Sequence, residues 1–260
     1  MCKPQVVADD LGVNLEFTAP PRRVVSLVPS LTESVATTVP GILVGATDYC
    51  THPSTLDSIV RVGGSKYPKL DAVLAARPDL VVANAEENRE EDVLRLRANG
   101  IPVWVTEAAR TVPGGLASVR RLLIDVLGAP EPRWLLDAER LWASAEPVHA
   151  TAVIPVWRKP WVVIGRDTFA GDVLRRLGIA NAYADNPDRY PRPTLDNLRA
   201  TFATGAANLL VLPDEPYLFT AQDGPEAFPG VRHALVSGRH LTWCGPSLVE
   251  AKNLLSRALA

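Results

Sequence analysis

Cys50 and His52 are the residues whose types and spacing most directly suggest chemistry, within the segment VGATDYCTHP (44–53). On an extended segment, side chains two residues apart point the same way, so a thiolate and an imidazole can begin a metal site. No C-x-x-C, H-E-x-x-H or H-x3-H spacing supports such a site. The further metal ligands that the sequence offers are Glu86, Glu87, His240 and Cys244. Two other interpretations stay open: a nucleophile with its base, and a half-buried thiol beside a hydrogen-bonded imidazole.

Aromatic residues form a second group of candidates. Tyr49 and Tyr190 lie in polar, loop-like stretches of the sequence. There, an aromatic body with a polar tip suits stacking on a flat ligand such as a corrin or a porphyrin. Trp157 and Trp243 are expected either to line a ligand site or to lie in the core, where large rings are usually mostly buried.

Charged pairs follow several predicted strands directly. The acidic pairs are Glu86-Glu87 and Asp214-Glu215, and Arg166-Asp167 follows the run WVVIG. The acids either cap the helices that come next, or accept hydrogen bonds from ligand amides and pair with a cationic group. Arg166 and Asp167 either bind an anionic ligand group or pair with each other.

These candidates need a scaffold, and the sequence predicts one of alternating strands and helices. The predicted strands are 23–28, 79–84, 101–106, 152–157, 161–165 and 209–213, with another ending in VGATDY. The predicted helices begin near residue 30 and otherwise span about 70–76, 90–100, 169–177, 194–203 and 246–259. Short strands separated by helices predict parallel βαβ units, whose ligands bind outside the carboxyl ends of the strands.

The alternation is interrupted once. Residues from Val112 to about 145 carry helix patterns only, so we predict an N-terminal α/β lobe over 1–111, a helical linker with a bridging helix over 112–147, and a C-terminal α/β lobe over 148–260. A Tyr-Pro pair, an Asp in the first helical turn, a strand and two acids occur in this order twice. The prediction is two related, Rossmann-like lobes with a ligand cleft between them.

Composition excludes some classes of function. The chain has 260 residues, of which 47% are hydrophobic, and contains no apolar run near the ~20 residues that a membrane span needs. A net charge of −2 offers no attraction to nucleic acid. Three widely spaced cysteines and the absence of a secretory signal in MCKPQVVADD predict a cytoplasmic protein, if the printed N-terminus is complete. The alternative is a cell-envelope lipoprotein anchored through Cys2.

The order of motifs along nearly the whole chain resembles a known superfamily. The motifs are PPRRVVSLVPSLTE, LVGATDY, LDAVLAARPDLVVA and VSGRHLTWCGPSLVEA. They resemble those of the helical-backbone metal receptors, the class III periplasmic substrate-binding proteins that serve ABC importers of cobalamin, haem and ferric siderophores. The cobalamin-binding branch is the most similar. The resemblance implies two α/β lobes spanned by a helix.

The resemblance also implies roles for particular residues. Tyr49 and Tyr190 fall on aromatic positions that contact the ligand, and Trp157 and Trp243 would line the cleft. Asp71 and Asp196 fall on the acids, one per lobe, that dock onto the transporter. Two departures concern the ligand: Ser65 stands where a ring is expected, and Glu86-Glu87 make this chain more acidic than cobalamin binders.

We therefore predict a non-catalytic binding protein for a metal chelate, with no intrinsic cofactor. The ligand would be a corrinoid, haem or a ferric siderophore, and the partner an ABC transporter permease. The alternative is a cytoplasmic enzyme or metallochaperone that reuses the fold around Cys50 and His52, although the sequence has no G-x-S-x-G, P-loop or G-x-G-x-x-G motif.

Overall fold

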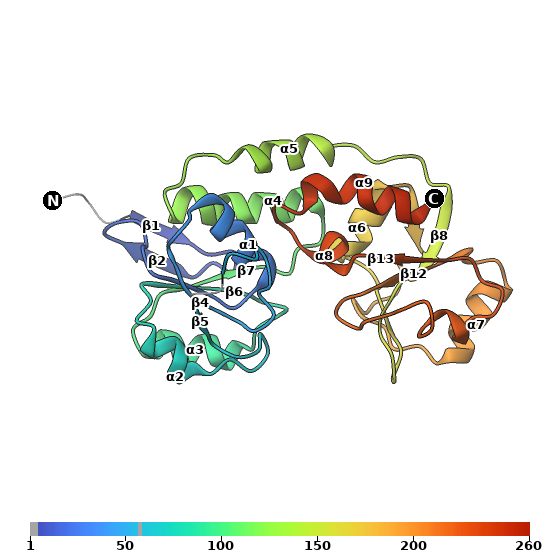
Figure 1. The fold of residues 1–260 in the computed structure, drawn as a ribbon, viewed down its shortest axis with the longest axis horizontal. Coiled ribbons are helices and arrows are strands. Elements are labelled where there is room, and N and C mark those ends of the chain that lie inside the picture. The colour runs from blue at the N-terminus through green and yellow to red at the C-terminus, as the bar shows by residue number, and fades with distance from the viewer. Residues whose placement is uncertain (1–4, 57–58) are drawn as a thin grey trace. The chain divides into compact units, whose positions relative to one another are not determined.

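A computed structural model describes residues 5–56 and 59–260, which form two compact α/β units (Figure 1). Of these residues, the first unit takes those up to Ala108, Leu116–Leu136 and Cys244–Pro246. The second unit takes Ala109–Gly115, Asp137–Trp243 and Ser247–Ala260. The predicted division at 111 and 147 stays a prediction.

The first unit is built on a five-stranded sheet in which every neighbouring pair is parallel. Its strands, in spatial order, are β5 (Val60–Arg61), β4 (Leu43–Ala46), β3 (Val24–Ser26), β6 (Leu80–Asn84) and β7 (Val103–Thr106). Its helices include α1 (Pro29–Thr38), α2 (Leu70–Ala75) and α3 (Glu90–Ala98). A separate antiparallel hairpin consists of β1 (Gln5–Ala8) and β2 (Asn14–Phe17).

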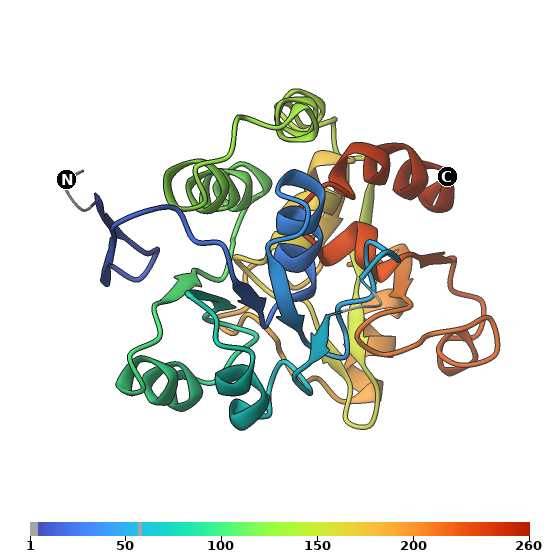
Figure 2. The ribbon, with the colours of Figure 1, turned by 60° about the vertical axis from the view of Figure 1, so that its left-hand side comes forward.

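Both faces of this sheet are covered, which explains its continuous apolar strands. Val25, Val81 and Val103 pack on one face against apolar side chains of α2 and α3. Val24 and Leu80 belong to the cluster on the other face, which contains residues of α1 and α4. Figures 1 and 2 show α2 and α3 on one side of this sheet and α4 on the other.

Helices connect the two units along the chain, as predicted. The helix α4 (Val112–Arg120) continues as the π-helical turn η1 (Arg121–Val126), and α5 follows at Arg133–Leu141. Both α4 and α5 begin in residues of one unit and end in residues of the other. Among the residues described, no helix is long and apolar enough to cross a membrane.

The second unit has a four-stranded parallel sheet and a short antiparallel hairpin. The sheet order is β11 (Ile179–Asn181), β8 (Ala150–Val153), β12 (Leu209–Pro213) and β13 (His233–Val236), and the hairpin is β9 (Pro155–Trp157) with β10 (Val162–Val163). The helices are α6 (Phe169–Arg176), α7 (Leu195–Ala203), α8 (Gly238–Thr242) and α9 (Leu248–Leu259), with a single 3-10 turn, η2 (Pro225–Ala227). In Figure 1, α7 lies on one side of this sheet, and α6, α8 and α9 lie on the other.

The α/β fold predicted from the sequence is confirmed, with local differences. The elements that were not predicted are β1 and β2 of the hairpin, β5, β11, β13, α8 and the short turn η2. Of the candidate residues here, His240 lies in α8 and Trp243 is the residue that ends this helix. The strand of this region is β13, whose exposed His233 obscures the apolar pattern.

Gly165 allows two segments of the second unit to approach closely. Its amide donates to the Arg189 carbonyl at 2.8 Å, and Val163 of β10 donates to the Pro191 carbonyl at 3.0 Å. A Cβ atom at Gly165 would overlap the Asp188 carbonyl and lie 2.8 Å from Pro191 Cδ. The segment that carries Tyr190 is therefore held against β10 because residue 165 has no side chain.

We expect Gly165→Ala to lower the free energy of unfolding by about 3 kcal/mol, because a buried backbone contact must open. Gly100→Ala is the control, since φ is +77° there and no atom lies within 4 Å of an added Cβ. That variant should lose only about 1 kcal/mol. Urea unfolding of both variants measures the difference, and equal losses would contradict the proposed steric role of Gly165.

Candidate functional site

The carboxyl ends of the parallel strands lie at one edge of each sheet, and most of the candidate residues follow these ends. In the first unit, Asn88 links three of the loops at this edge. Its Nδ2 donates to the carbonyls of Leu27 (3.2 Å) and Ser65 (2.9 Å), and its Oδ1 accepts from the Asn84 amide (2.8 Å). Asn88 is buried. The loops after β3, β5 and β6 are therefore joined by one side chain, which the sequence analysis did not single out.

Tyr49 is presented on the loop after β4, with 65% of its surface exposed. Hydrogen bonds from a neighbouring strand hold the backbone of this loop: Arg61 Nη1 of β5 donates to the carbonyls of Thr47 (3.0 Å) and Cys50 (2.9 Å). The Asp48 amide donates to the Gly63 carbonyl at 2.8 Å. Tyr49 is thus an exposed ring on a fixed backbone, as a preformed ligand contact requires.

Cys50 points away from solvent and belongs to this support. It is fully buried, and its Sγ lies 2.9 Å from Thr32 Oγ1 and 3.2 Å from Thr47 Oγ1. Burial raises the pKa of the thiol, which the hydrogen bonds from the two threonines only partly offset. Cys50 is therefore a protonated thiol at neutral pH.

The extended geometry that the metal hypothesis assumed for Cys50 and His52 is absent. The backbone turns here, with the Cys50 amide donating to the Thr47 carbonyl (3.1 Å), and His52 Nδ1 lies 3.0 Å from Thr51 Oγ1. Within the described part of the chain, no three His, Cys, Asp or Glu side chains are grouped to hold a metal ion.

The two other weak metal candidates also have local roles. His240 is buried in α8, and its Nε2 lies 2.9 Å from Glu250 Oε1. Cys244 packs against the apolar cluster of the first unit, and burial raises the pKa of its thiol to about 12. Cys244 is therefore a protonated thiol at neutral pH, and the Nε2 of His240 already has a partner in Glu250.

Glu86 and Glu87 follow β6 at the edge of the first sheet, and Asn84 caps the turn. The amides of both acids donate to Asn84 Oδ1, at 2.8 and 3.2 Å. Burial, together with repulsion from the Glu86 carboxylate, raises the pKa of Glu87 to about 7, although the Lys66 ammonium opposes the shift. Lys66 donates to the Glu86 carbonyl at 2.7 Å. Glu87 is therefore only partly ionised at neutral pH.

The acidic pair of the second unit follows β12. Asp214 Oδ1 accepts from the Gly238 amide at 2.6 Å, so it caps the start of α8. Burial and the neighbouring Asp214 raise the pKa of Glu215, which accepts a hydrogen bond from the Trp243 side chain. Trp243 is only 7% exposed and also lies below the Arg239 guanidinium at 5.9 Å. Its ring therefore belongs mainly to the packed interior.

Three other candidates of the second unit lie at the surface. Tyr190 is 40% exposed and Trp157, the last residue of β9, is 45% exposed. Arg166 forms an ion pair with the neighbouring Asp167 at 3.2 Å. Of the two interpretations of these residues, the one in which they pair with each other therefore agrees with the structure.

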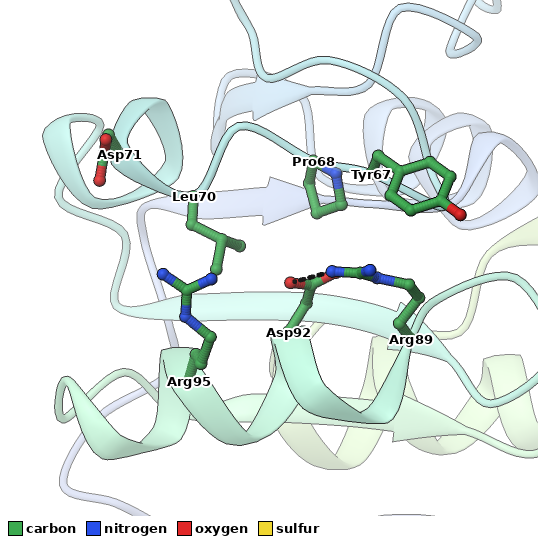
Figure 3. A pocket seen from close by; sticks show the side chains of 7 residues that line it. All are labelled: Tyr67, Pro68, Leu70, Asp71, Arg89, Asp92 and Arg95. Carbon is green, nitrogen blue, oxygen red and sulfur yellow. Dashed lines mark hydrogen bonds and ion pairs between the residues drawn. The ribbon is translucent and has the colours of Figure 1, made fainter.

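Asp71 lines an open pocket between α2 and α3, which Figure 3 shows with the ion pair of Arg89 and Asp92. The lining residues are Tyr67, Pro68, Leu70, Asp71, Arg89, Asp92 and Arg95. Asp71 is the second residue of α2, and Asp196 is the second residue of α7. Both are exposed, and each helix leads into the strand next to an edge strand of its own sheet, β6 beside β7 and β12 beside β13. The repeat noticed in the sequence thus occupies corresponding positions in the two sheets.

Known proteins resemble this chain in both sequence and fold. A vitamin B12-binding protein of Vibrio cholerae is 22% identical over 189 residues, which cover 69% of this chain and 67% of that protein. The solved structure of a periplasmic vitamin B12 binding protein of Vibrio cholerae matches with a TM-score of 0.68 and 17% identity, over 92% of this chain and 97% of that one. A periplasmic haem-binding protein from Pseudomonas aeruginosa matches with a TM-score of 0.74 and 22% identity, over 92% of each chain. No protein-family model matches.

The chain has the fold of the class III periplasmic substrate-binding proteins. The predicted resemblance to the helical-backbone metal receptors is therefore confirmed. In this chain the candidate residues Tyr49 and Asp214 lie on loops that follow parallel strands, β4 and β12.

The prediction of a cytoplasmic protein is wrong, because the solved structures that share the class III fold here are of periplasmic proteins. That prediction relied on the start of the printed sequence and on the cysteines. Cys50 is buried, and a thiol that solvent does not reach needs no reducing compartment.

The raised pKa of Glu87 predicts a stability that falls as pH rises. Between pH 4.5 and 7 the folded state retains a proton on Glu87 that the unfolded chain has lost, so ionisation favours unfolding. Glu87→Gln should therefore stabilise the chain by about 2 kcal/mol at pH 8 and leave it unchanged at pH 4. Urea unfolding at both pH values measures this, with Glu107→Gln, an exposed acid, as the control. A Glu87→Gln variant that is less stable at pH 8 would contradict the assignment.

Proposed function

We propose that this chain is a periplasmic binding protein for a metal chelate and has no catalytic activity. The observation that carries the proposal is Tyr49, a largely exposed ring on a backbone fixed by Arg61 and by the buried Cys50. A rigid aromatic side chain binds a flat macrocycle at a low cost in conformational entropy. Relatives named for binding vitamin B12 or haem support this class of ligand.

Within this class, we propose a corrinoid. The carboxyl edges of the two sheets carry the acids Glu86, Glu87, Asp214 and Glu215. Haem bears two carboxylates, which neighbouring carboxylates repel, whereas the amide groups of a corrinoid donate hydrogen bonds to them. Because Glu87 is only partly ionised, it can also donate to an amide oxygen of the ligand.

The contacts with the chelate would come from exposed aromatic residues. We assign Tyr49 from the first unit, and Tyr190 and Trp157 from the second, because these rings are exposed at or near strand ends. Trp243 contributes little surface, since its ring is almost completely buried. Arg166 would contact the ligand only if its pairing with Asp167 were broken, so it is the weakest of the predicted contacts.

The partner would be the permease of an ABC importer, which docks onto one acid of each unit. Asp71 and Asp196 support this role because both are exposed at the second position of a helix that precedes an interior strand of its sheet. An exposed carboxylate on a rigid helix suits pairing with a cationic side chain of the permease.

Titration with cyanocobalamin, and separately with haemin, tests the proposed ligand class. We expect micromolar or tighter binding of cyanocobalamin and weaker binding of haemin. Calorimetry measures both affinities. Tyr49→Ala and Tyr190→Ala should each weaken binding about tenfold, because each removes a stacking surface. Leu94→Ala, which alters a similarly exposed residue on α3, is the control and should bind normally. If neither a corrinoid, haem nor a ferric siderophore binds, the proposed function is wrong.

A second experiment separates docking from ligand binding. The double variant Asp71→Asn, Asp196→Asn should bind the chelate as the unaltered chain does, because neither acid is assigned to the ligand. In cells that contain the importer, uptake of the chelate should fall at least about tenfold through loss of the two ion pairs. Glu16→Asn is the matched surface control, and unchanged uptake in the double variant would rule out docking by these acids.

A further inference from the structure

Trp157 is the exposed end of a continuous series of aromatic rings in the second unit. Its ring meets Tyr217 edge-on, with 5.7 Å between centroids, and Tyr217 lies 4.7 Å from Phe219. Phe219 is stacked on Trp161 at 6.1 Å, and both belong to the buried apolar cluster of this unit. The exposed indole is therefore supported by rings of the core and is held in place.

A polar network fixes the segment that carries Tyr217. Its hydroxyl donates to Asp223 Oδ2 at 2.6 Å, and Arg158 forms ion pairs with both Asp223 and Glu226. The Arg158 guanidinium also lies over the Trp161 ring at 5.3 Å. The hydrogen bond to Asp223 raises the pKa of Tyr217, so its hydroxyl keeps its proton at neutral pH.

This arrangement leaves apolar surface exposed at the carboxyl edge of the second sheet. Leu218, which stands between Tyr217 and Phe219 in the sequence, is 66% exposed. It follows the end of β12 by five residues. The segment that carries Tyr190 is hydrogen-bonded to β10, which in turn pairs with β9 and its Trp157. Rigid, exposed apolar side chains next to candidate ligand contacts are typical of a binding surface.

We propose that Trp157, Tyr217 and Leu218 form a ligand-contact surface, here called the β9 surface, that packs against the flat apolar part of the chelate. This inference rests on the proposed function and extends it to two residues that the sequence did not indicate. Tyr217 acts there as a hydrogen-bonded phenol that packs through its ring, and it does not coordinate the metal.

Calorimetric titration with cyanocobalamin and haemin tests the packing role. Calorimetry is used in place of fluorescence because Trp157 is itself a fluorophore and its loss would alter a fluorescence signal. Trp157→Ala should weaken binding of the chelate that the unaltered chain prefers by about tenfold, and Leu218→Ser by about threefold. Leu254→Ser is the matched control, since Leu254 is an exposed leucine on α9 of the same unit. It should bind within about twofold of the unaltered chain.

The visible absorption spectrum of bound haemin tests the role of Tyr217. Tyr217→Phe keeps the ring and removes the hydroxyl, so the absorption spectrum of the bound haemin should not change. A changed spectrum would show coordination by the phenolate and overturn the assignment. If the unaltered chain binds a chelate and Trp157→Ala and Leu218→Ser bind it equally well, the β9 surface is refuted while the proposed function stands. If the unaltered chain binds no chelate at all, the proposed function itself fails.

Discussion

Parallel pairing of strands decides where the loops of both sheets lie. In the parallel sheet of each unit it sends the carboxyl end of every strand to the same edge, so the loops that leave these ends share one surface. It also requires long crossover connections between neighbouring strands, several of which contain helices, and these helices cover both faces of the first sheet. The interior is taken up by aliphatic side chains, and polar and aromatic residues collect at the edge.

Within that edge, rigidity comes from side chains that were not obvious candidates. Asn88 bonds the backbone at Leu27, Ser65 and Asn84, and the buried Cys50 thiol next to Tyr49 in the chain bonds Thr32 and Thr47. In the second unit, Arg158 and Asp223 support the rings near Trp157. In both units, buried or paired polar groups hold exposed aromatic rings, so that the surface is organised before a ligand arrives.

The sequence predicted the fold well because its strongest patterns are local. Strands such as 79–84 and helices such as 90–100 have local patterns of apolar residues that match the elements found in the structure. Of the elements that were missed, β11, β13 and α8 are only three to five residues long, and in β13 the polar, exposed His233 interrupts the apolar pattern. The formation of β11 and β13 depends on pairing with β8 and β12, which no local pattern records.

The site was predicted less completely for the same reason. Tyr49 stood out by its polar context, whereas the pairing of Tyr217 with Asp223 is decided by the turn after β12. The spacing of Cys50 and His52 suggested a shared face only under the assumption of an extended backbone, and the turn at Thr47 removes that face.

The near-neutral pKa of Glu87 has a consequence for the thermodynamics of binding. At pH 7 this side chain is divided between carboxyl and carboxylate, so a ligand that donates a hydrogen bond to it draws it to the charged form and releases a fraction of a proton. That proton is taken up by the buffer. The observed heat of binding then varies with the ionisation enthalpy of the buffer, and the slope of this dependence counts the protons that Glu87 exchanges with the solution.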